Sequence, residues 1–249
     1  MKAIIIAAGI GSRLGELTKD LPKPLIDVNG KSILERQIEL FKKFGIEEII
    51  IVTGYKNNKI KFLDVNYIYN SEYQNTEQIG SLMTARNEIS GDVIISFGDI
   101  LFEEKILEEL LKNENNFVLV SDPNWKKSYE SRPDNPPTQS DFIALENNKI
   151  IKFFKNSLEI DNCYSVVEFI GLMKLSATSS DIFVKKYKNI EKNHTGKFYF
   201  APSFMKAKFI DFFEELRLSG IQMNTLNVDG QWCEIDTIQD LEIAKKLFI

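Results

Sequence analysis

The chain has 249 residues, of which 43% are hydrophobic and 27% charged, and its formal net charge is −5 at pH 7. This composition is that of an ordinary globular protein, and the acidic balance argues against a nucleic-acid-binding surface, which normally shows as a basic excess. No apolar run approaches 18 residues and no signal peptide precedes the first strand, so we expect a cytoplasmic protein without a membrane partner.

The rare reactive side chains narrow the chemistry further. Cys163 and Cys233 are far apart and belong to no disulfide or zinc pattern, so both are expected to be buried thiols. The single histidine, His194, lies in the polar string EKNHTGK and is expected at the surface. These few residues therefore disfavour histidine-based acid–base catalysis and a zinc site.

The first half of the chain alternates strands with helices. Continuous apolar runs predict strands that are buried on both faces of a parallel sheet, and amphipathic segments between them predict helices. The strands are expected at 2–7, 47–55, 65–70, 92–99 and 116–122, and the helices at 32–45, 81–89 and 103–111. Ser32 and Glu35 form a capping-box pattern, and Gly45 ends the helix that they begin. The alternation indicates a doubly wound α/β sheet.

After Asp122 the pattern changes. Residues 123–141 hold four of the seven prolines, which predicts an irregular excursion. The elements expected beyond it are a hairpin around Asn147 and Asn148, a long strand at 163–175, helices at 176–188 and 202–218, a strand at 223–228 and a final helix from 238. We expect one domain over 1–249 whose second half adds antiparallel strands to a mixed sheet.

A long loop, AAGIGSRLGELTKDLPKPL at 7–25, follows the first strand. A glycine-rich turn behind a strand lets backbone N–H groups approach phosphates. Only the first two glycines of the dinucleotide fingerprint are present, which disfavours an NAD-linked oxidoreductase. Arg13 and Lys23 are permanent cations, and Pro22 and Pro24 stiffen the chain around the lysine. These two cations suit a triphosphate whose α-phosphorus is attacked.

Residues 2–35 closely resemble the signature of the sugar-phosphate and choline-phosphate nucleotidylyltransferases: Ala-Ala-Gly-x-Gly-x-Arg, then Pro-Lys, then Asn-Gly-Lys before a helix. The resemblance implies a Rossmann-like nucleotidyltransferase fold of the GT-A-like type. It also implies that an acceptor oxygen attacks the α-phosphorus of an NTP and expels pyrophosphate, with Arg13 and Lys23 as the catalytic residues that hold the phosphates. The nucleotide-binding residues that follow from it are Ala7, Ala8, Gly9 and Gly11.

Two aspartates are candidates for a metal site. Such a transfer needs Mg²⁺, which is usually held by one or two carboxylates together with substrate oxygens. Asp99 ends a strand at the edge where open α/β sheets bind ligands, and Asp236 precedes a helix with a Thr237–Asp240 capping box. Both positions match the metal aspartates of the resembled family, so Asp99 and Asp236 are expected to hold Mg²⁺. Glu234 is either a further ligand or a partner of the two cations.

The later segments favour a cytidylyltransferase branch. Residues 70–85 resemble a segment of choline-phosphate and aminoethylphosphonate cytidylyltransferases, although Glu77 and Gln78 replace two asparagines of that segment. The branch makes CTP the expected nucleotide, with Gln78 and Ser81 as contacts of the base. The Trp-x-x-x-Tyr-x-x-Arg pattern in the excursion resembles the phosphonate-linked members. The expected acceptor-binding residues are Trp125, Tyr129, Arg132 and Glu168.

The acceptor is left open by these residues. Aromatic rings hold a quaternary ammonium by cation–π attraction, Glu168 and Glu77 suit an amine, and Arg132 suits a carboxylate. Phosphocholine, aminoethylphosphonate, phosphoethanolamine and phosphoglutamine all fit this description. The expected partners are CTP and one such small phosphorylated acceptor, and a homodimer is a possible assembly.

The function expected from the sequence is a Mg²⁺-assisted, CTP-dependent cytidylyltransferase whose CDP- or CMP-linked product serves the decoration of cell-surface glycans. Its nucleotide-binding half covers about 1–122 and its acceptor-binding half about 123–249. One alternative is a hexose-1-phosphate uridylyl- or thymidylyltransferase, which has the same chemistry and another acceptor. The other is a nucleotide-binding regulatory subunit without catalytic activity.

Overall fold

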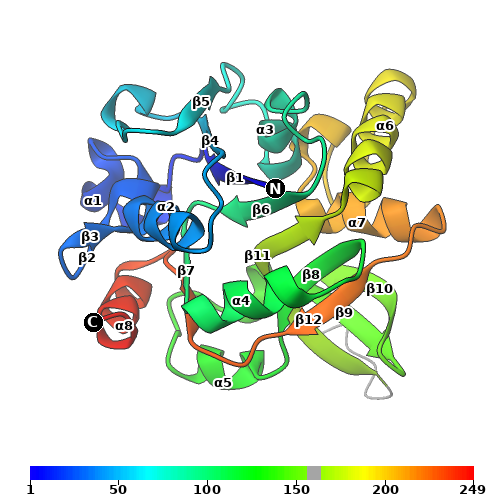
Figure 1. The fold of residues 1–249 in the computed structure, drawn as a ribbon. Helices are drawn as coiled ribbons and strands as arrows, with labels where there is room; N and C mark the ends of the chain where they lie inside the picture. Colours follow the sequence, from blue (N-terminus) through cyan, green and yellow to red (C-terminus); the bar gives the residue numbers. More distant parts are fainter. Residues whose placement is uncertain (156–163) are drawn as a thin grey trace.

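The computed structural model describes residues 1–155 and 164–249. Its centre is a nine-stranded mixed sheet in the order β10-β9-β11-β6-β1-β4-β5, with β8 and β12 joined to it through β11 (Figure 1). The strands are β1 Lys2–Ala7, β4 Ile49–Thr53, β5 Asn66–Tyr69, β6 Val93–Phe97, β8 Phe117–Asp122, β9 Asp141–Glu146, β10 Lys149–Lys155, β11 Ser165–Leu175 and β12 Asn224–Asn227. Two short pairs lie beside it: β2 (Asp27–Val28) with β3 (Lys31–Ser32), and β7 (Ile100–Phe102) with β13 (Trp232–Glu234).

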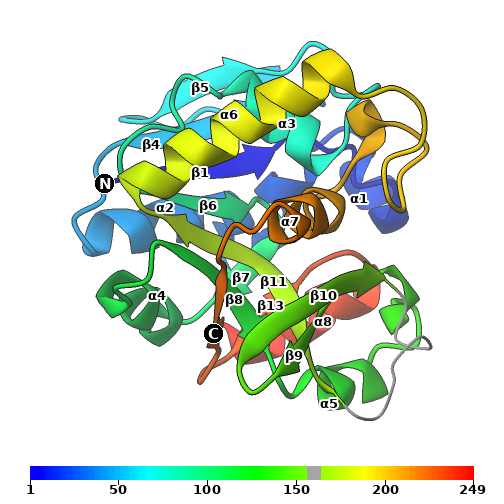
Figure 2. The ribbon, with the colours of Figure 1, turned by 90° about the vertical axis from the view of Figure 1, so that its right-hand side faces the viewer.

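Helices cover both faces of this sheet. They are α1 Glu16–Lys19, α2 Ile33–Lys43, α3 Gln78–Thr84, α4 Glu104–Lys112, α5 Trp125–Glu130, α6 Ala177–Asn193, α7 Phe209–Leu218 and α8 Ile238–Leu247. Figure 2 shows α3, α6 and α7 on the side that faces the viewer, whereas α2 and α4 lie on the other side. Among the described residues, no helix is both long and apolar enough to cross a lipid bilayer.

The parallel strands bring three chain segments to one edge. β1 pairs in parallel with β4 and β6, and β4 pairs in parallel with β5. All five residues of β4 and of β6 are buried, as continuous apolar runs predict for a sheet covered on both faces. The mixed α/β fold expected from the sequence is confirmed. Because parallel strands point the same way, the segments that follow β1, β4 and β6 meet at a single edge.

β11 connects this parallel core to the β9–β10 hairpin. Its C-terminal half pairs with β6, with Leu172 opposite Ser96, and its N-terminal half pairs with β9. Gly171 lies between the two halves with φ +85°, and a Cβ there would lie 2.4 Å from the ring of Phe97. The strand therefore changes its register at this glycine. Its first half, which includes Glu168, extends past the end of β6.

Several local predictions are confirmed. Ser32 Oγ accepts from the Glu35 N–H at 3.2 Å and Glu35 Oε2 accepts from the Ser32 N–H at 3.3 Å, which forms the expected capping box. Asn147 and Asn148 have φ of 51° and 62°, the left-handed pair that a two-residue hairpin turn needs. The thiol of Cys233 is buried and His194 is exposed, whereas Cys163 lies outside the described residues.

Other elements differ from the expectation. The helix predicted at 81–89 spans Gln78–Thr84, and the helix predicted from 202 begins at Phe209 after a 3₁₀ turn at Phe204–Lys206. The proline-rich excursion contains the short helix α5, and the loop at 7–25 contains α1. The pair β7–β13 was not predicted, because its strands have three residues each, too few for a periodic pattern.

Candidate functional site

A cavity of about 300 Å³ opens at the carboxyl edge of β1 and β6. The loop after β1, the start of α3, the turn after β6 and the first half of β11 contribute to its wall. The charged side chains of this wall are the carboxylates of Glu77, Asp99, Asp141, Glu168, Glu234 and Asp236 and the cations of Arg13, Lys23 and Lys208. Carboxylates outnumber cations, so an anionic ligand needs further positive charge to bind here.

Lys23 lies at the centre of this charge cluster. Its side chain is buried, and Nζ lies 2.5 Å from Asp236 Oδ1 and 2.7 Å from Asp99 Oδ2. Arg13 Nη2 lies 2.6 Å from Asp236 Oδ2. Burial by itself lowers the pKa of Lys23, but the charges of Asp99, Asp236 and Glu234 outweigh it and raise this pKa above its ordinary value. The fold thus brings together both cations and both aspartates that the sequence singled out.

Gly11 makes room for Lys23. Gly11 has φ +69°, and a Cβ at this position would lie 2.8 Å from Lys23 Cβ. The absence of a side chain at Gly11 therefore leaves the space that the Lys23 side chain occupies.

The Gly11→Ala substitution is expected to lower kcat/KM for the NTP by about tenfold or more, because the new methyl group displaces Lys23 from its two aspartates. Gly15→Ala is the matched control, since Gly15 has φ +57° but a Cβ at this position would have no heavy atom within 4 Å. Both variants carry backbone strain, and only the first has the steric conflict. Equal activity losses in the two purified variants would contradict this role of Gly11.

Asp99, Glu234 and Asp236 form a carboxylate cluster. Each offers one oxygen, and these oxygens lie within 4.8 Å of one another. Asp99 Oδ1 is buried without a hydrogen-bond partner in the described part of the chain. Burial and the charges of Asp236 and Asp99 raise the pKa of Glu234 well above its ordinary value. Three carboxylates with a free oxygen fit a hard divalent cation, which would relieve this repulsion. Glu234, left open by the sequence, belongs to the cluster.

The predicted acceptor contact Arg132 has another position. Its guanidinium is buried, donates from Nε to Asp240 Oδ1 at 2.6 Å, and donates from Nη2 to the Glu234 carbonyl at 3.3 Å. These two hydrogen bonds fix the backbone that carries Glu234 and use two of the five N–H donors of the guanidinium. Arg132 is not among the residues that line the cavity, and its contact with an acceptor carboxylate stays a prediction.

Asp240 completes this support. Its Oδ2 accepts from the backbone N–H groups of Asp236 at 3.0 Å and Thr237 at 2.8 Å, and from Asn135 Nδ2 at 3.2 Å. Asn135 Oδ1 in turn accepts from Arg13 at 3.1 Å. The capping box read from the sequence thus holds Asp236 in place, whereas no sequence pattern pointed to Asn135.

The other acceptor candidates separate into two groups. Glu168 lines the cavity, and its Oε1 accepts from the Tyr129 hydroxyl at 2.6 Å. Trp125 packs in a small cluster with Phe142 and donates from Nε1 to the Val166 carbonyl at 3.1 Å. Trp125 therefore belongs to a small core and is not among the residues that line the cavity, so its contact with the acceptor stays a prediction.

The nucleotide candidates also differ in position. Gly9, Gly11 and Gln78 line the cavity. Ala7 and Ala8 are buried at the end of β1, so that only their backbone is suited to contact a ligand. Ser81 is buried, and its Oγ accepts from Asn70 Nδ2 at 3.1 Å. Ser81 therefore supports the segment before α3 and is not among the residues that line the cavity, so its contact with the base stays a prediction.

Burial of Glu168 makes the stability of the protein depend on pH. Burial raises the pKa of Glu168 to about 7, against the hydrogen bonds from Tyr129 and Ser140. Because the pKa of Glu168 is higher in the folded than in the unfolded protein, the charged carboxylate destabilises the folded state fully above pH 7. Below pH 4.5, the ordinary pKa of the group, the carboxyl is protonated in both states and this destabilisation is absent. Glu168→Gln is expected to raise the free energy of unfolding at pH 8, by about 3 kcal/mol at most, and not at pH 4.5. Urea unfolding at both pH values measures this, and an equal effect at both would contradict it.

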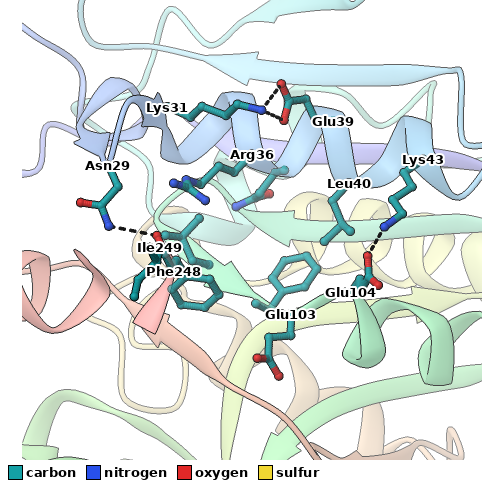
Figure 3. A pocket seen from close by; sticks show the side chains of 13 residues that line it. Asn29, Lys31, Arg36, Glu39, Leu40, Lys43, Glu103, Glu104, Phe248 and Ile249 are labelled. Carbon is teal, nitrogen blue, oxygen red and sulfur yellow. Dashed lines mark hydrogen bonds and ion pairs between the residues drawn. The ribbon is translucent and has the colours of Figure 1, made fainter. Parts of the chain in front are cut away.

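A second hollow of about 500 Å³ lies between α2, β7 and the last residues of the chain (Figure 3). Four of its charged side chains form two pairs, Lys31 with Glu39 and Lys43 with Glu104. Arg36 donates to the Val28 carbonyl, and Glu103 accepts from the Gln231 N–H. In contrast, the buried side-chain oxygens without a partner within 1–155 and 164–249 are Asp99 Oδ1, Asp141 Oδ1 and Glu168 Oε2. The three residues that carry these oxygens all line the 300 Å³ cavity. That cavity is therefore the candidate active site.

Comparison with known proteins identifies the family of this chain. Residues 3–129 match the family of MobA-like NTP transferase domains. The chain is 31% identical to a CTP:phosphoglutamine cytidylyltransferase from Campylobacter jejuni subsp. jejuni, over 98% of each chain. Its fold matches a CTP:phosphocholine cytidylyltransferase from Streptococcus pneumoniae with a TM-score of 0.75 and 20% identity, and the match covers 100% of this chain and 99% of the other.

It also matches the inositol-1-phosphate CTP transferase from T. maritima, with TM-score 0.73, 20% identity and coverage of 99% and 95% of the two chains. The names of these proteins contain three different acceptors, so the shared fold does not choose between acceptors. The family match over about half of the chain and the full-length relative show that this protein belongs to the nucleotidyltransferases of the MobA-like NTP transferase family.

Proposed function

We propose that this protein is a CTP-dependent cytidylyltransferase that acts on a small phosphorylated or phosphonate acceptor. An acceptor oxygen forms a bond to the α-phosphorus of CTP while the bond between that phosphorus and pyrophosphate breaks. The observation that carries the proposal is the cluster of Arg13, Lys23, Asp99, Glu234 and Asp236 in one cavity at the carboxyl edge of the sheet. The full-length similarity to a cytidylyltransferase supports the choice of nucleotide.

Asp99, Glu234 and Asp236 would hold Mg²⁺, and the free Asp99 Oδ1 supports this assignment. When bound, Mg²⁺ supplies positive charge to phosphate oxygens. Turnover is expected to disappear in excess EDTA and to return when Mg²⁺ is added in excess of the chelator. Because ion binding also relieves carboxylate repulsion, Mg²⁺ is expected to raise the melting temperature of the protein without nucleotide. Full activity in EDTA would contradict the assignment.

The two cations of the loop act on the phosphates. Lys23 is held by two carboxylates in a fixed position. Arg13 lines the same cavity, half exposed, and its guanidinium is held by Asp236 and Asn135. Charges that are already oriented stabilise developing phosphate charge without reorganising in the transition state. The backbone around Gly9 is open enough for a close approach of the nucleotide, since no heavy atom lies within 4 Å of a Cβ built there.

Gln78, which lines the cavity, is the residue that we propose to distinguish cytosine from uracil. The backbone N–H of Phe209 donates to Gln78 Oε1 in a long hydrogen bond of 3.4 Å. Because an N–H requires an acceptor, this contact fixes the amide orientation and leaves the NH₂ donors of Gln78 for the cavity. Cytosine has an acceptor at N3, where uracil has a donor. A donor of Gln78 directed at position 3 of the base would therefore favour CTP.

The Gln78→Glu substitution is expected to lower the ratio of kcat/KM for CTP to that for UTP by about tenfold or more. Glutamate keeps an acceptor for the Phe209 N–H but replaces the donor that cytosine requires. Gln74→Glu is the control, since it makes the same charge change at an exposed position of the same segment. Pyrophosphate release with each NTP at equal concentration measures the ratio, and an unchanged ratio in Gln78→Glu would remove this residue from base selection.

The proposal extends to the setting of the reaction. CTP is a cytoplasmic metabolite, and the CDP- or CMP-linked product would be an activated donor for surface polysaccharide biosynthesis in the same compartment. The nucleotide half, about 1–122, and the acceptor half, about 123–249, act within one domain, and a homodimer is the assembly to look for in solution. Sedimentation of the full chain tests that assembly, and localisation of the protein in the producing cell tests the compartment.

A further inference from the structure

The wall of the active-site cavity contains two buried carboxylate oxygens that the proposed function does not use. Of the three partnerless oxygens, Asp99 Oδ1 belongs to the metal cluster. Glu168 Oε2 and Asp141 Oδ1 remain. Glu168 is 3% exposed and Asp141 is 9% exposed. A buried carboxylate oxygen without a donor costs free energy, so in a ligand site it marks the place of a donor that the ligand brings.

Asp141 has cations nearby. It lies opposite Lys155 in the β9–β10 hairpin, and the charges of Lys155 and Lys208 act on it and partly offset its burial. Lys208 lines the same cavity. A ligand cation at Asp141 would therefore compete with cations of the protein.

Glu168 has a different environment. Its Oε1 is held by the neutral hydroxyl of Tyr129, which also hydrogen-bonds to Ser140. The positive charge of Arg132 lowers the pKa of Glu168, but the hydrogen bonds of this guanidinium go to Asp240 and to the Glu234 carbonyl. Asp122, its neighbour on β8, adds negative charge. Within the described chain, Glu168 makes no ion pair that would balance its charge.

We infer that Glu168 Oε2 receives an N–H group of a protonated amine on the acceptor, so that the acceptor is a phosphate or phosphonate that carries a primary ammonium group. This inference rests on the proposed function and specifies its acceptor. Because Tyr129 holds Oε1, Oε2 is the oxygen of this cavity-lining residue that is left for a donor of the ligand. The ammonium group then balances the charge of Glu168 and donates a hydrogen bond to Oε2. Such a charge-assisted hydrogen bond is about twice as strong as one between neutral groups.

A quaternary ammonium satisfies the charge and leaves Oε2 without a donor. Trp232 lines the same cavity and would be the contact for methyl groups, with its Nε1 fixed by Asp122 Oδ2 at 2.9 Å. A primary ammonium would therefore contact Glu168 Oε2, whereas the methyl groups of a quaternary ammonium would contact Trp232. Since the cavity has a volume of about 300 Å³, both would have to be small.

Matched acceptors test the inference directly. The first set is phosphoethanolamine, its isostere propyl phosphate, and phosphocholine, and the second is aminoethylphosphonate with its isostere propylphosphonate. Phosphoglutamine with its analogue lacking the α-amine is the third. Pyrophosphate release is followed at saturating CTP and Mg²⁺. In each set that is turned over, the acceptor with a primary ammonium is expected to have a kcat/KM at least about tenfold higher, mainly through a lower KM for the acceptor.

Two variants connect this preference to the residue. Glu168→Gln is expected to reduce the ratio within each set to near one and to leave the KM for CTP within about twofold of the wild-type value. Asp141→Asn removes the other unpartnered carboxylate and is expected to keep the ratio. Both variants are first checked for native circular dichroism and cooperative unfolding.

The outcomes separate the inference from the proposed function. Equal or better turnover of propyl phosphate or phosphocholine, or a ratio that survives Glu168→Gln, would overturn the inference and leave a working cytidylyltransferase. A preference that is lost in Asp141→Asn and kept in Glu168→Gln would show that the amine binds Asp141 and not Glu168, and would also overturn the inference. If no acceptor releases pyrophosphate from CTP, the proposed function fails and the inference falls with it.

Discussion

Lys23→Met is expected to lower kcat/KM for CTP by about 10²-fold or more, on the scale of removing one preoriented electrostatic contact from a transition state. Methionine has nearly the length of lysine, so the substitution removes the charge and keeps the packing against Gly11. It leaves Asp99, Glu234 and Asp236 without their central cation. The melting temperature of this variant is therefore expected to rise more steeply with Mg²⁺ than that of the wild type.

Steady-state pyrophosphate release and a thermal melt with and without Mg²⁺ measure the two effects. Lys19→Met is the control, because Lys19 belongs to the same loop and its side chain is 68% exposed in a pair with Glu16. If folded Lys23→Met keeps activity within about threefold of the wild type, Lys23 is a structural partner of the aspartates and takes no part in the transfer.

Asp236→Asn is expected to have the second large effect, a loss of turnover of about 10³-fold. This carboxylate pairs with both Lys23 and Arg13 and is one of three oxygens that would hold Mg²⁺. Its replacement by the neutral isostere disturbs the ion and both cations at once. Burial favours a raised pKa for Asp236, but Lys23 and Arg13 lower it below its ordinary value, so the wild-type side chain is charged at neutral pH.

The stability of Asp236→Asn is expected to stay within a few degrees of the wild-type melting temperature, because Lys23 keeps Asp99 as a partner and Glu234 loses a repelling neighbour. Asp229→Asn, an exposed change in the same region of the chain, is the control for activity. If Asp236→Asn and Asp99→Asn both fail to fold, the two carboxylates are structural and the metal assignment is wrong.

The sequence predicted most of the framework because its signals are local. Continuous apolar runs identified β1, β4 and β6, and the carboxyl ends of parallel strands meet at one edge of a sheet. This geometry, together with the resemblance of residues 2–35, was enough to place Arg13, Lys23 and Asp99 near one another. Asp236 was added from its place before a helix with a capping box and from the resemblance, because the three-residue strand β13 before it has no periodic signal.

Side-chain partners could not be read in the same way. Arg132 is separated from Asp240 by more than a hundred residues, and nothing in the proline-rich excursion indicated that its guanidinium would be buried in that ion pair. Ser81 lies in a matching motif but on the buried side of α3, where it binds Asn70. Whether a polar side chain faces the cavity or supports its wall depends on tertiary packing. The resemblance identified which segments form the site, and the structure showed which way their polar side chains face.

Transfer of the α-phosphorus from CTP to the acceptor is the central claim, and isotope labelling tests it most directly. The enzyme is incubated with Mg²⁺, the primary-ammonium acceptors named above and CTP labelled at either the α- or the γ-phosphorus. The account predicts that the α-label appears in the acceptor-linked product and the γ-label in pyrophosphate, with CTP preferred over UTP and dTTP by about tenfold or more. Label from the γ-position in the acceptor, or turnover of a hexose 1-phosphate with preference for UTP or dTTP, would contradict it.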